Sequence, residues 1–295
     1  MIRRSLLSSL AALCLLSPQA NVANAATPLR VEVYNPGERS LFPVASEIVM
    51  GEREAILIDA QFQKNDAEAL VSKIQASGRQ LKTIYISQSD PDYYFGLDVI
   101  HAAFPEAKIV ATAPTVAAIK ASMQGKLAHW GPILKENAPS QLIVPEVLAS
   151  EHLTLEGHHL DIKGLHGAAP ARSYLWIPSL KTVVGGVVIA SGIHVWMADT
   201  QSVASRQAWQ KTLREIEALK PAAIVPGHFL GEAPAGNAAL RFTARYLRDF
   251  DAAATRAADA PALIAAMQKA YPDLGEAASL ELSAKVIKGE MAWPQ

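Results

Sequence analysis

Short apolar segments of strand length alternate with amphipathic segments of helix length, in two successive rounds along the sequence. In residues 30–34, Val31 and Val33 alternate with Glu32, which is the pattern of a half-buried strand. Further strands are predicted over residues 43–49, 54–59, 83–86, 108–111, 142–147, 152–155, 159–163, 173–177, 182–189 and 222–225. Helices are predicted over residues 65–74, 97–104, 205–219 and 237–257, with another starting at Pro114 and a mostly helical remainder. Strands interleaved with helices twice over predict an α/β protein, an αββα sandwich.

The first 25 residues have the pattern of an export signal rather than of folded structure. Arg3 and Arg4 precede an apolar run over residues 6–16, and Ala23-Asn24-Ala25 fits a small-x-small cleavage site. The run is too short to span a membrane. We therefore expect cleavage after Ala25 and a single periplasmic or secreted domain over residues 26–295, with C-terminal helices. An uncleaved anchor is the alternative.

Cysteine usage excludes several kinds of site. Cys14 is the only cysteine, and it lies inside the apolar run after Leu13, where a lipid-attachment motif needs a small residue. The mature chain would have no thiol, which excludes internal disulfides, cysteine-rich zinc ribbons and iron–sulfur clusters.

The net charge and the motifs that do not occur limit the classes of molecule that the chain is expected to bind. Half of the residues are apolar and the formal net charge is −1, so the chain has ample core material and no broad basic face for nucleic acid. The Gly-x-Ser-x-Gly, P-loop and Gly-x-Gly-x-x-Gly patterns do not occur. We expect a small-molecule ligand or substrate, with no nucleic acid and no membrane partner after cleavage.

Polar residues follow four of the predicted strands, where sites form in layered α/β folds. They are Asp59, residues 88–93, His194 and His228. Asp90 and Asp92 lie two residues apart on one turn and could offer oxygen ligands to a single cation. The alternative is a solvated acidic turn in which Asp92 caps the next helix.

The histidines differ in their sequence surroundings. His228 follows Pro226-Gly227 after an apolar strand, where it has no evident role in a helix or a core. His194 lies in an apolar run, so burial would require a carbonyl, an acid or a metal as its partner. His166 could face the same cleft, whereas the adjacent pair at 158 and 159 suits a solvent-facing hairpin tip. Each of them could equally be structural.

In order, these elements resemble the metallo-β-lactamase fold superfamily between about residues 31 and 231. Members of this family have a strand ending in Ile-Asp, then His-x-His-x-Asp-His, a Gly-His turn, a Gly-Asp after a strand and a late Pro-Gly-His. The chain offers Ile58-Asp59, the loop over residues 83–97, the strand pair over residues 174–186 and the segment 224–228. The resemblance implies the αββα fold of that family.

The metal-binding motif of the family is depleted in this chain. On the resemblance, the motif's first two histidines fall on Gln88 and Asp90, its aspartate on Asp92 and its next histidine on Tyr93. The Gly-His turn falls near residues 167–168, with His166 two residues early, and the bridging aspartate falls on Gly186. Only Asp92 and His228 remain, so the usual two-zinc centre is not expected.

Two hypotheses follow for the function. The first is an exported hydrolase acting on a small ester, lactone or amide, not a typical dizinc β-lactamase. At most one Zn²⁺, Mn²⁺ or Fe²⁺ ion would be bound by Asp90, Asp92 and His228, with help from His194 or His166. Asp92, Gln88 and Tyr93 would serve catalysis by acting as a base or by orienting water and substrate.

The second hypothesis is a metal-free, non-catalytic protein that keeps the fold and binds a ligand in the old cleft. Aromatic residues would then line that cleft, the candidates being Trp176, Trp196, Tyr93, Tyr94 and Phe95.

Overall fold

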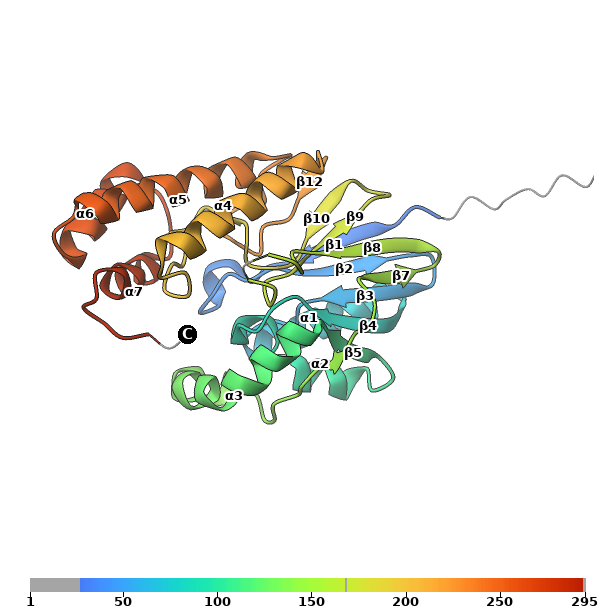
Figure 1. The fold of residues 1–295 in the computed structure, drawn as a ribbon. Coiled ribbons are helices and arrows are strands. Elements are labelled where there is room, and N and C mark those ends of the chain that lie inside the picture. Colours follow the sequence, from blue (N-terminus) through green and yellow to red (C-terminus); the bar gives the residue numbers. More distant parts are fainter. Residues whose placement is uncertain (1–26, 168, 294–295) are drawn as a thin grey trace, which may run out of the picture.

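Two mixed β-sheets lie face to face, with helices on both outer sides, in a computed structural model that describes residues 27–167 and 169–293 (Figure 1). The predicted export signal lies outside the described residues. The αββα sandwich expected from the sequence is confirmed, whereas the assignment of residues 26–295 to a single domain stays a prediction.

The first sheet contains six strands in the order β1-β2-β3-β4-β5-β6. The first three strands are antiparallel neighbours, and β3 to β6 run parallel, each pair in the parallel part being connected through a helix or a long segment. The strands are β1 (Arg30–Tyr34), β2 (Ser46–Met50), β3 (Glu54–Ile58), β4 (Gln80–Ile86), β5 (Lys108–Ala111) and β6 (Glu146–Val147).

The second sheet contains five strands in the order β12-β10-β9-β8-β7, and a separate pair joins β11 to β13. The members are β7 (His152–Leu155), β8 (His158–Lys163), β9 (Tyr174–Ile177), β10 (Thr182–Val184), β11 (Ala190–Ser191), β12 (Ala223–Ile224) and β13 (His228–Phe229). The small β11–β13 pair matters for function because β13 begins with His228.

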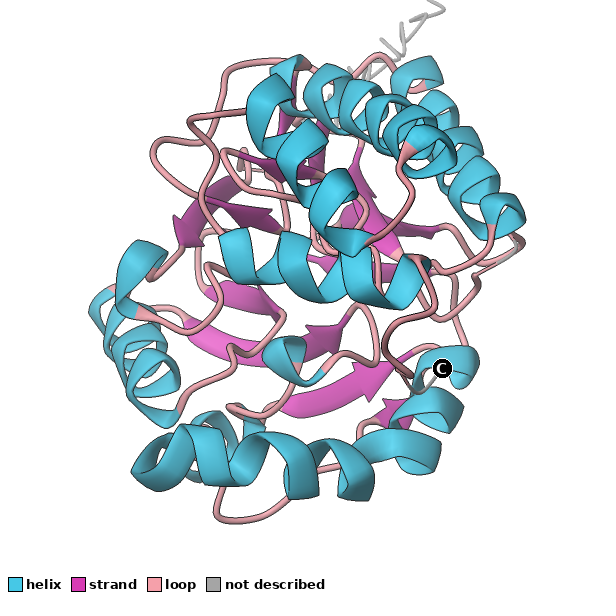
Figure 2. Cartoon of the chain, turned by 90° about the vertical axis from the view of Figure 1, so that its left-hand side faces the viewer, coloured by secondary structure: helices cyan, strands magenta, loops and turns pink. Residues whose placement is uncertain are grey.

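Helices form the two outer layers (Figure 2). On the first sheet lie α1 (Lys64–Ala76), α2 (Leu97–Ala103) and α3 (Ala113–Leu134), and the second half of the chain contributes α4 (Val203–Ala218), α5 (Ala238–Arg256), α6 (Ala260–Ala270) and α7 (Ala277–Ile287). Short 3₁₀ turns occur at η1 (Gly37–Arg39), η2 (Pro91–Tyr93) and η3 (Lys135–Asn137). Within the described residues, no helix has both the length and the apolarity that a membrane crossing requires.

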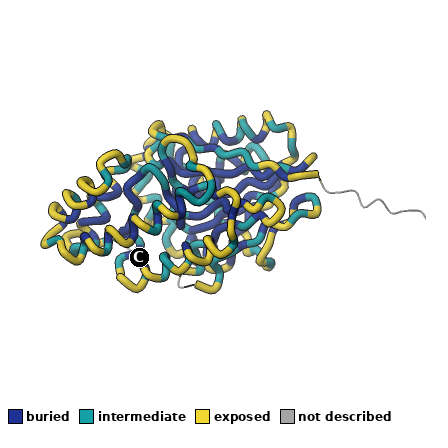
Figure 3. Tube along the Cα trace, turned by 90° about the horizontal axis from the view of Figure 1, so that it is seen from above, coloured by how far each residue is buried: buried dark blue, intermediate teal, exposed yellow. Residues whose placement is uncertain are grey.

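Three apolar cores correspond to the three interfaces between the layers. One fills the space between the sheets around Val49, Ile58 and Leu175, a second lies between the first sheet and α1–α3, and a third binds α4–α7 to the second sheet. Figure 3 shows the buried backbone concentrated in the middle of the molecule and the exposed backbone on the outer helices and loops.

Two predicted strands lose more than half of their length in the structure. The strand predicted over residues 182–189 ends at Val184, because Gly185 and Gly186 follow with φ of +74° and +80°, a conformation that breaks a strand. The strand predicted over 142–147 is reduced to Glu146–Val147, where it pairs with β5. The glycine turn is the more important difference, because it forms one wall of the site.

Candidate functional site

Asp59 holds the loop over residues 87–96 in place from the end of β3. Its Oδ1 accepts a hydrogen bond from the Ser87 backbone amide at 2.8 Å, and its Oδ2 accepts one from the Ser87 hydroxyl at 2.7 Å. Asp59 has φ of +60°, which is uncommon for a non-glycine residue and turns its carboxylate back toward β4. The two hydrogen bonds therefore fix the start of the loop to the end of β3.

Burial dominates the electrostatics of Asp59. The side chain is completely buried, and this raises its pKa to about 7, while the hydrogen bonds from Ser87 oppose the shift. The negative charge of Asp92 adds to the increase. Asp59 is thus a buried acid that titrates close to neutral pH.

Two glycines bring the second half of the chain against this loop. A Cβ atom on Gly227 would overlap the carbonyl oxygen of Gly186, and one on Gly186 would overlap the carbonyl oxygen of Ser173. Backbones can approach this closely only where side chains are absent. The contact places His228, the residue after Gly227, next to the loop.

Asp92, His228 and Tyr93 form a chain of side-chain contacts at the resulting junction. His228 Nε2 lies 2.7 Å from Asp92 Oδ2, and His228 Nδ1 lies 3.0 Å from the Tyr93 hydroxyl oxygen. Asp92 and Tyr93 come from η2, and His228 from β13, so 136 residues of sequence separate the first pair. The structure therefore brings together three of the residues named from the sequence.

The raised pKa of Tyr93 determines which atoms in this chain of contacts carry a proton. Complete burial and the nearby Asp92 carboxylate raise the pKa of Tyr93 well above its ordinary value, so its hydroxyl keeps its proton. That hydroxyl can donate to His228 Nδ1, and Nε2–H can then donate to Asp92. Both ring nitrogens of His228 are engaged in this arrangement.

Asp90 faces away from the group. Its Oδ1 lies 3.3 Å from Lys126 Nζ on α3, and the same ammonium donates to the Ser89 carbonyl at 2.7 Å. The structure thus pairs Asp90 with a lysine rather than with His228.

The two further histidines also lie elsewhere. His194 is 2% exposed, and its Nδ1 lies 3.0 Å from the Tyr246 hydroxyl inside the core beneath α5. Burial lowers the pKa of His194, which favours the neutral imidazole. His166 is exposed, with its Nε2 3.4 Å from Glu151.

Gln88 is buried at the start of the loop, and its Nε2 has no hydrogen-bond partner among the described residues. A buried amide without a partner is costly in free energy, which makes Gln88 a candidate donor to a ligand.

The aromatic residues predicted for the cleft have separate positions. Tyr94 and Phe95 are buried in the core between the first sheet and its helices, and Trp176 packs against the core of α4–α7. Trp196 instead packs against Phe42 and Trp293, at ring-centre distances of 6.3 and 5.4 Å. Of these residues, Tyr93 is the one that contacts His228.

Glu47 is a buried acid that the sequence interpretation did not single out. It lies in β2, it is completely buried, and neither carboxylate oxygen has a side-chain hydrogen-bond partner within the described residues. Burial and the nearby Asp59 raise its pKa well above the ordinary value. The sequence feature that could have identified Glu47 is the presence of an acidic residue inside the apolar strand predicted over residues 43–49.

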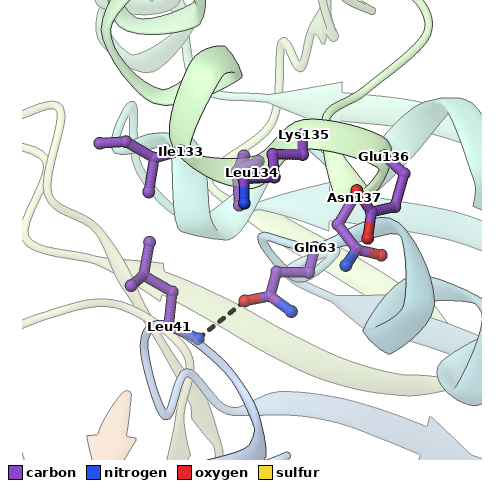
Figure 4. A pocket seen from close by; sticks show the side chains of 7 residues that line it. All are labelled: Leu41, Gln63, Ile133, Leu134, Lys135, Glu136 and Asn137. Carbon is purple, nitrogen blue, oxygen red and sulfur yellow. Dashed lines mark hydrogen bonds between the residues drawn. The ribbon is translucent and has the colours of Figure 1, made fainter.

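A pocket of about 280 Å³ lies apart from this group (Figure 4). Its lining is Leu41, Gln63, Ile133, Leu134, Lys135, Glu136 and Asn137. Gln63 Oε1 accepts a hydrogen bond from the Leu41 amide at 2.7 Å. None of the candidate residues named from the sequence lines this pocket.

The donors present do not fit the two-metal centre that the resemblance implies. Gly186 has no side chain and no room for one, Tyr93 keeps its proton, and Asp90 pairs with Lys126. Asp92 and His228 remain, which is fewer than the three protein ligands of a catalytic zinc site. Across residues 27–167 and 169–293, no three His, Cys, Asp or Glu side chains gather as a metal-binding group.

Comparison with solved structures identifies the fold. The metallo-β-lactamase from Pontibacter korlensis superposes with a TM-score of 0.54 at 15% sequence identity, over 76% of this chain and 97% of that one. DIM-1 metallo-β-lactamase gives 0.54 at 18% identity, over 76% and 99% of the two chains. TMB-1 gives 0.52 at 21% identity, over 75% and 92%.

Sequence comparison identifies the family. No curated protein matches the chain by sequence. The sequence profile described as "Metallo-beta-lactamase superfamily" matches residues 41–228, which include Asp59, the loop over residues 87–96 and His228. This match covers more than half of the chain and confirms the resemblance noted from the motifs, so the chain belongs to the metallo-β-lactamase superfamily.

Proposed function

We propose that the chain is an exported hydrolase of this superfamily that acts on a small ester, lactone or amide without the two-metal centre. The observation that carries the proposal is the contact chain from Asp92 through His228 to Tyr93, at 2.7 and 3.0 Å. It lies where the motifs of the family converge, and it joins an acid, an imidazole and a phenol. Residues 1–25 would direct export and be removed.

Asp92 is the candidate general base. Its Oδ2 contacts His228, whereas no hydrogen bond from another described residue engages its Oδ1. The side chain of Asp92 is 10% exposed and that of His228 15%, so a small part of the pair can be reached from outside. Oδ1 would accept a proton from water as the water attacks the carbonyl carbon of the substrate.

His228 and Tyr93 are positioning residues in this mechanism. The Nε2–H group of His228 donates to Asp92 and fixes the direction of the carboxylate, and the Tyr93 hydroxyl fixes the imidazole tautomer from the other side. The proton held on Asp92 would then pass to the leaving oxygen or nitrogen as the bond to the acyl carbon breaks. The net reaction adds one water across that bond.

Gln88 is the candidate donor to the oxyanion. Its buried Nε2 has no partner among the described residues, and a pre-oriented amide stabilises negative charge that develops on a carbonyl oxygen. A substrate oxygen bound there would satisfy an otherwise costly buried group.

A single divalent metal, Zn²⁺, Mn²⁺ or Fe²⁺, is not needed for these steps. Asp92 and His228 would be its two donors, whereas in the steps above Asp92 is the base and His228 positions it. The treatment that separates the two assignments is chelation, because a metal-dependent enzyme loses activity with EDTA and regains it with added metal.

The experiment measures hydrolysis by the mature protein of a panel of nitrophenyl esters, a small lactone and a nitroanilide, with and without EDTA. We expect turnover that EDTA does not reduce, and a loss of about 100-fold or more in kcat/KM for Asp92→Asn. Asp161→Asn, which removes a partly exposed carboxylate paired with Lys163 on β8, is the matched control and should keep the wild-type rate. Loss of turnover with EDTA and recovery with metal would contradict the proposal, as would ligand binding without turnover.

A further inference from the structure

The C-terminal strap, defined here as residues 289–293, runs from α7 back toward the middle of the molecule (Figure 1, dark red segment). Glu290 fixes its start, because Glu290 Oε1 accepts a hydrogen bond from the Ala260 amide at 2.7 Å. Trp293 fixes its other end, where the Trp293 carbonyl accepts a hydrogen bond from Gln201 Nε2 at 3.1 Å. The strap is therefore attached to the folded domain at two points.

Asp199 is the strongest attachment of Trp293. Its Oδ1 accepts a hydrogen bond from the Trp293 indole at 2.9 Å, and its Oδ2 accepts one from the Trp196 indole at 2.6 Å. Hydrogen bonds to an ionised acceptor are stronger than those between neutral groups. One carboxylate thus holds two tryptophans side by side, with ring centres 5.4 Å apart.

The rings around Trp293 come from three separate parts of the fold. His129 of α3 lies 5.8 Å from Trp293, and Trp196 lies 6.3 Å from Phe42, between ring centres. Phe42 in turn lies 5.3 Å from Trp130. The strap therefore closes a ring of aromatic side chains that joins α3, the β1–β2 loop and the segment after β11.

This aromatic group adjoins the candidate site on two sides. Phe42 is two residues from Val44, which forms an isolated β-bridge with His228. Asp199 is near enough to Asp90 for that charge to act on it, and Asp90 belongs to the loop that carries Asp92. The strap thus lies in the same part of the fold as the loop that supplies the Asp92–His228 pair.

We propose that the C-terminal strap is a latch over the entrance to the Asp92–His228 pair, held shut by Asp199 and Trp293. Displacement of the Trp293 ring would widen access to Asp92, whose side chain is 10% exposed while the strap is attached. The inference rests on the proposed function for its meaning, but it makes a claim about access that can be tested without turnover.

The test measures how fast diethyl pyrocarbonate modifies individual histidines, read by peptide mass spectrometry. The reagent acylates accessible neutral imidazoles, so the modification rate of His228 reports whether the latch is open. His166, which is exposed, and His194, which is buried against Tyr246, give references for full exposure and full protection in the same sample.

Trp293→Ala should raise the modification rate of His228 by roughly tenfold, about the effect of losing one hydrogen bond to a charged acceptor. The rates of His166 and His194 should not change. Met291→Ala is the matched control, because Met291 is an exposed residue of the same strap, and it should leave His228 at the wild-type rate.

Asp199→Asn is the second variant, in case Trp293→Ala does not fold. An asparagine amide cannot accept hydrogen bonds from both indoles through two oxygens, so the rate at His228 should again rise. An unchanged His228 rate in both variants would overturn the proposal. A parallel rise at His194 would also overturn it, because that pattern indicates general loosening of the fold rather than the opening of a latch.

Discussion

The loop over residues 87–96 has two faces that behave very differently. On its inner face, Asp92 and Tyr93 contact His228 from the far end of the chain. On its outer face, Asp90 and the Ser89 carbonyl contact Lys126 of α3. The two aspartates lie two residues apart, yet one joins the candidate site and the other forms an ion pair.

Pro91 accounts for the difference. Asp90 has an extended backbone with ψ of 141°, and Pro91 begins the 3₁₀ turn that contains Asp92. Asp90, before this change from extended to helical backbone, contacts Lys126, and Asp92, within the turn, contacts His228. Close spacing of two acids in sequence is therefore not enough to infer a shared cation.

The largest expected effect separates the two faces directly. Asp92→Asn should reduce kcat/KM for ester hydrolysis by about 10²–10⁴-fold, the usual contribution of a general base. Asp90→Asn should change it by no more than about twofold, because the Asp90 carboxylate contacts Lys126 and makes no hydrogen bond to the side chains of Asp92, His228 or Tyr93. Equal losses in the two variants would show that both aspartates serve one site, which would contradict the different roles assigned to Asp90 and Asp92.

Restoring the family's bridging aspartate tests how firmly the inner face is built. Gly186→Asp should lower the free energy of unfolding by about 3–5 kcal/mol, because the new side chain meets the Ser173 carbonyl at a φ of +80°. Gly157→Asp is the control, since Gly157 has a φ of +86° with open space around it and should cost about 1–2 kcal/mol. Urea denaturation measures both, and equal costs would show that packing at Gly186 is not restrictive.

The pH dependence of the free energy of unfolding tests the role of Asp59, whose carboxylate accepts the hydrogen bonds that fix the loop. Burial raises the pKa of Asp59 to about 7 in the folded protein, above the ordinary value of the unfolded chain, so the folded state binds this proton more tightly. The contribution of the Asp59 proton to the free energy of unfolding is complete below about pH 4. It is lost as the pH rises through about 7, and the total loss is up to about 4 kcal/mol.

Urea denaturation of the wild type and of Asp59→Asn between pH 4.5 and pH 8 isolates this contribution. The difference between the two proteins should vary across that window in the direction just given. A difference that is constant with pH would contradict the assignment of a raised pKa to Asp59.

The smallest expected effect concerns the outer face. Lys126→Met removes the partner of Asp90 and should lower the free energy of unfolding by less than about 1 kcal/mol, because the pair is partly exposed. Thermal unfolding at low and high salt measures it. A loss of several kcal/mol would mean that the Asp90–Lys126 pair stabilises the loop more than the hydrogen bonds between Ser87 and Asp59 do.

Much of the fold could be predicted because its signals are local. The apolar stripe of Trp209, Leu213 and Ile216 is buried in α4, and the alternation in residues 30–34 marks a strand, although its three middle residues are all partly buried. Four motif elements in order, at residues 58–59, 83–97, 174–186 and 224–228, also sufficed to indicate the family. These features do not depend on which distant residue arrives as a partner.

The geometry of the site could not be predicted, because it depends on distant partners. Lys126 draws Asp90 away from a distance of 36 residues, and Tyr246 engages His194 from 52 residues away. No spacing rule encodes either contact. The residues after Val184 were predicted as continuing strand because valine and isoleucine surround the two glycines, and the left-handed turn there is determined by close backbone packing.

In the proposed function, the Asp92–His228 pair acts in place of the metal centre of the family. Metal analysis of the mature protein tests it most directly, after purification without a metal-binding tag, incubation with Zn²⁺, Mn²⁺ or Fe²⁺, and removal of free ions. We predict well under one ion per chain, with no difference between the wild type and the Asp92→Ala and His228→Ala variants. About one ion per chain in the wild type, lost in both variants, would contradict the claim and return the pair to the role of metal ligands.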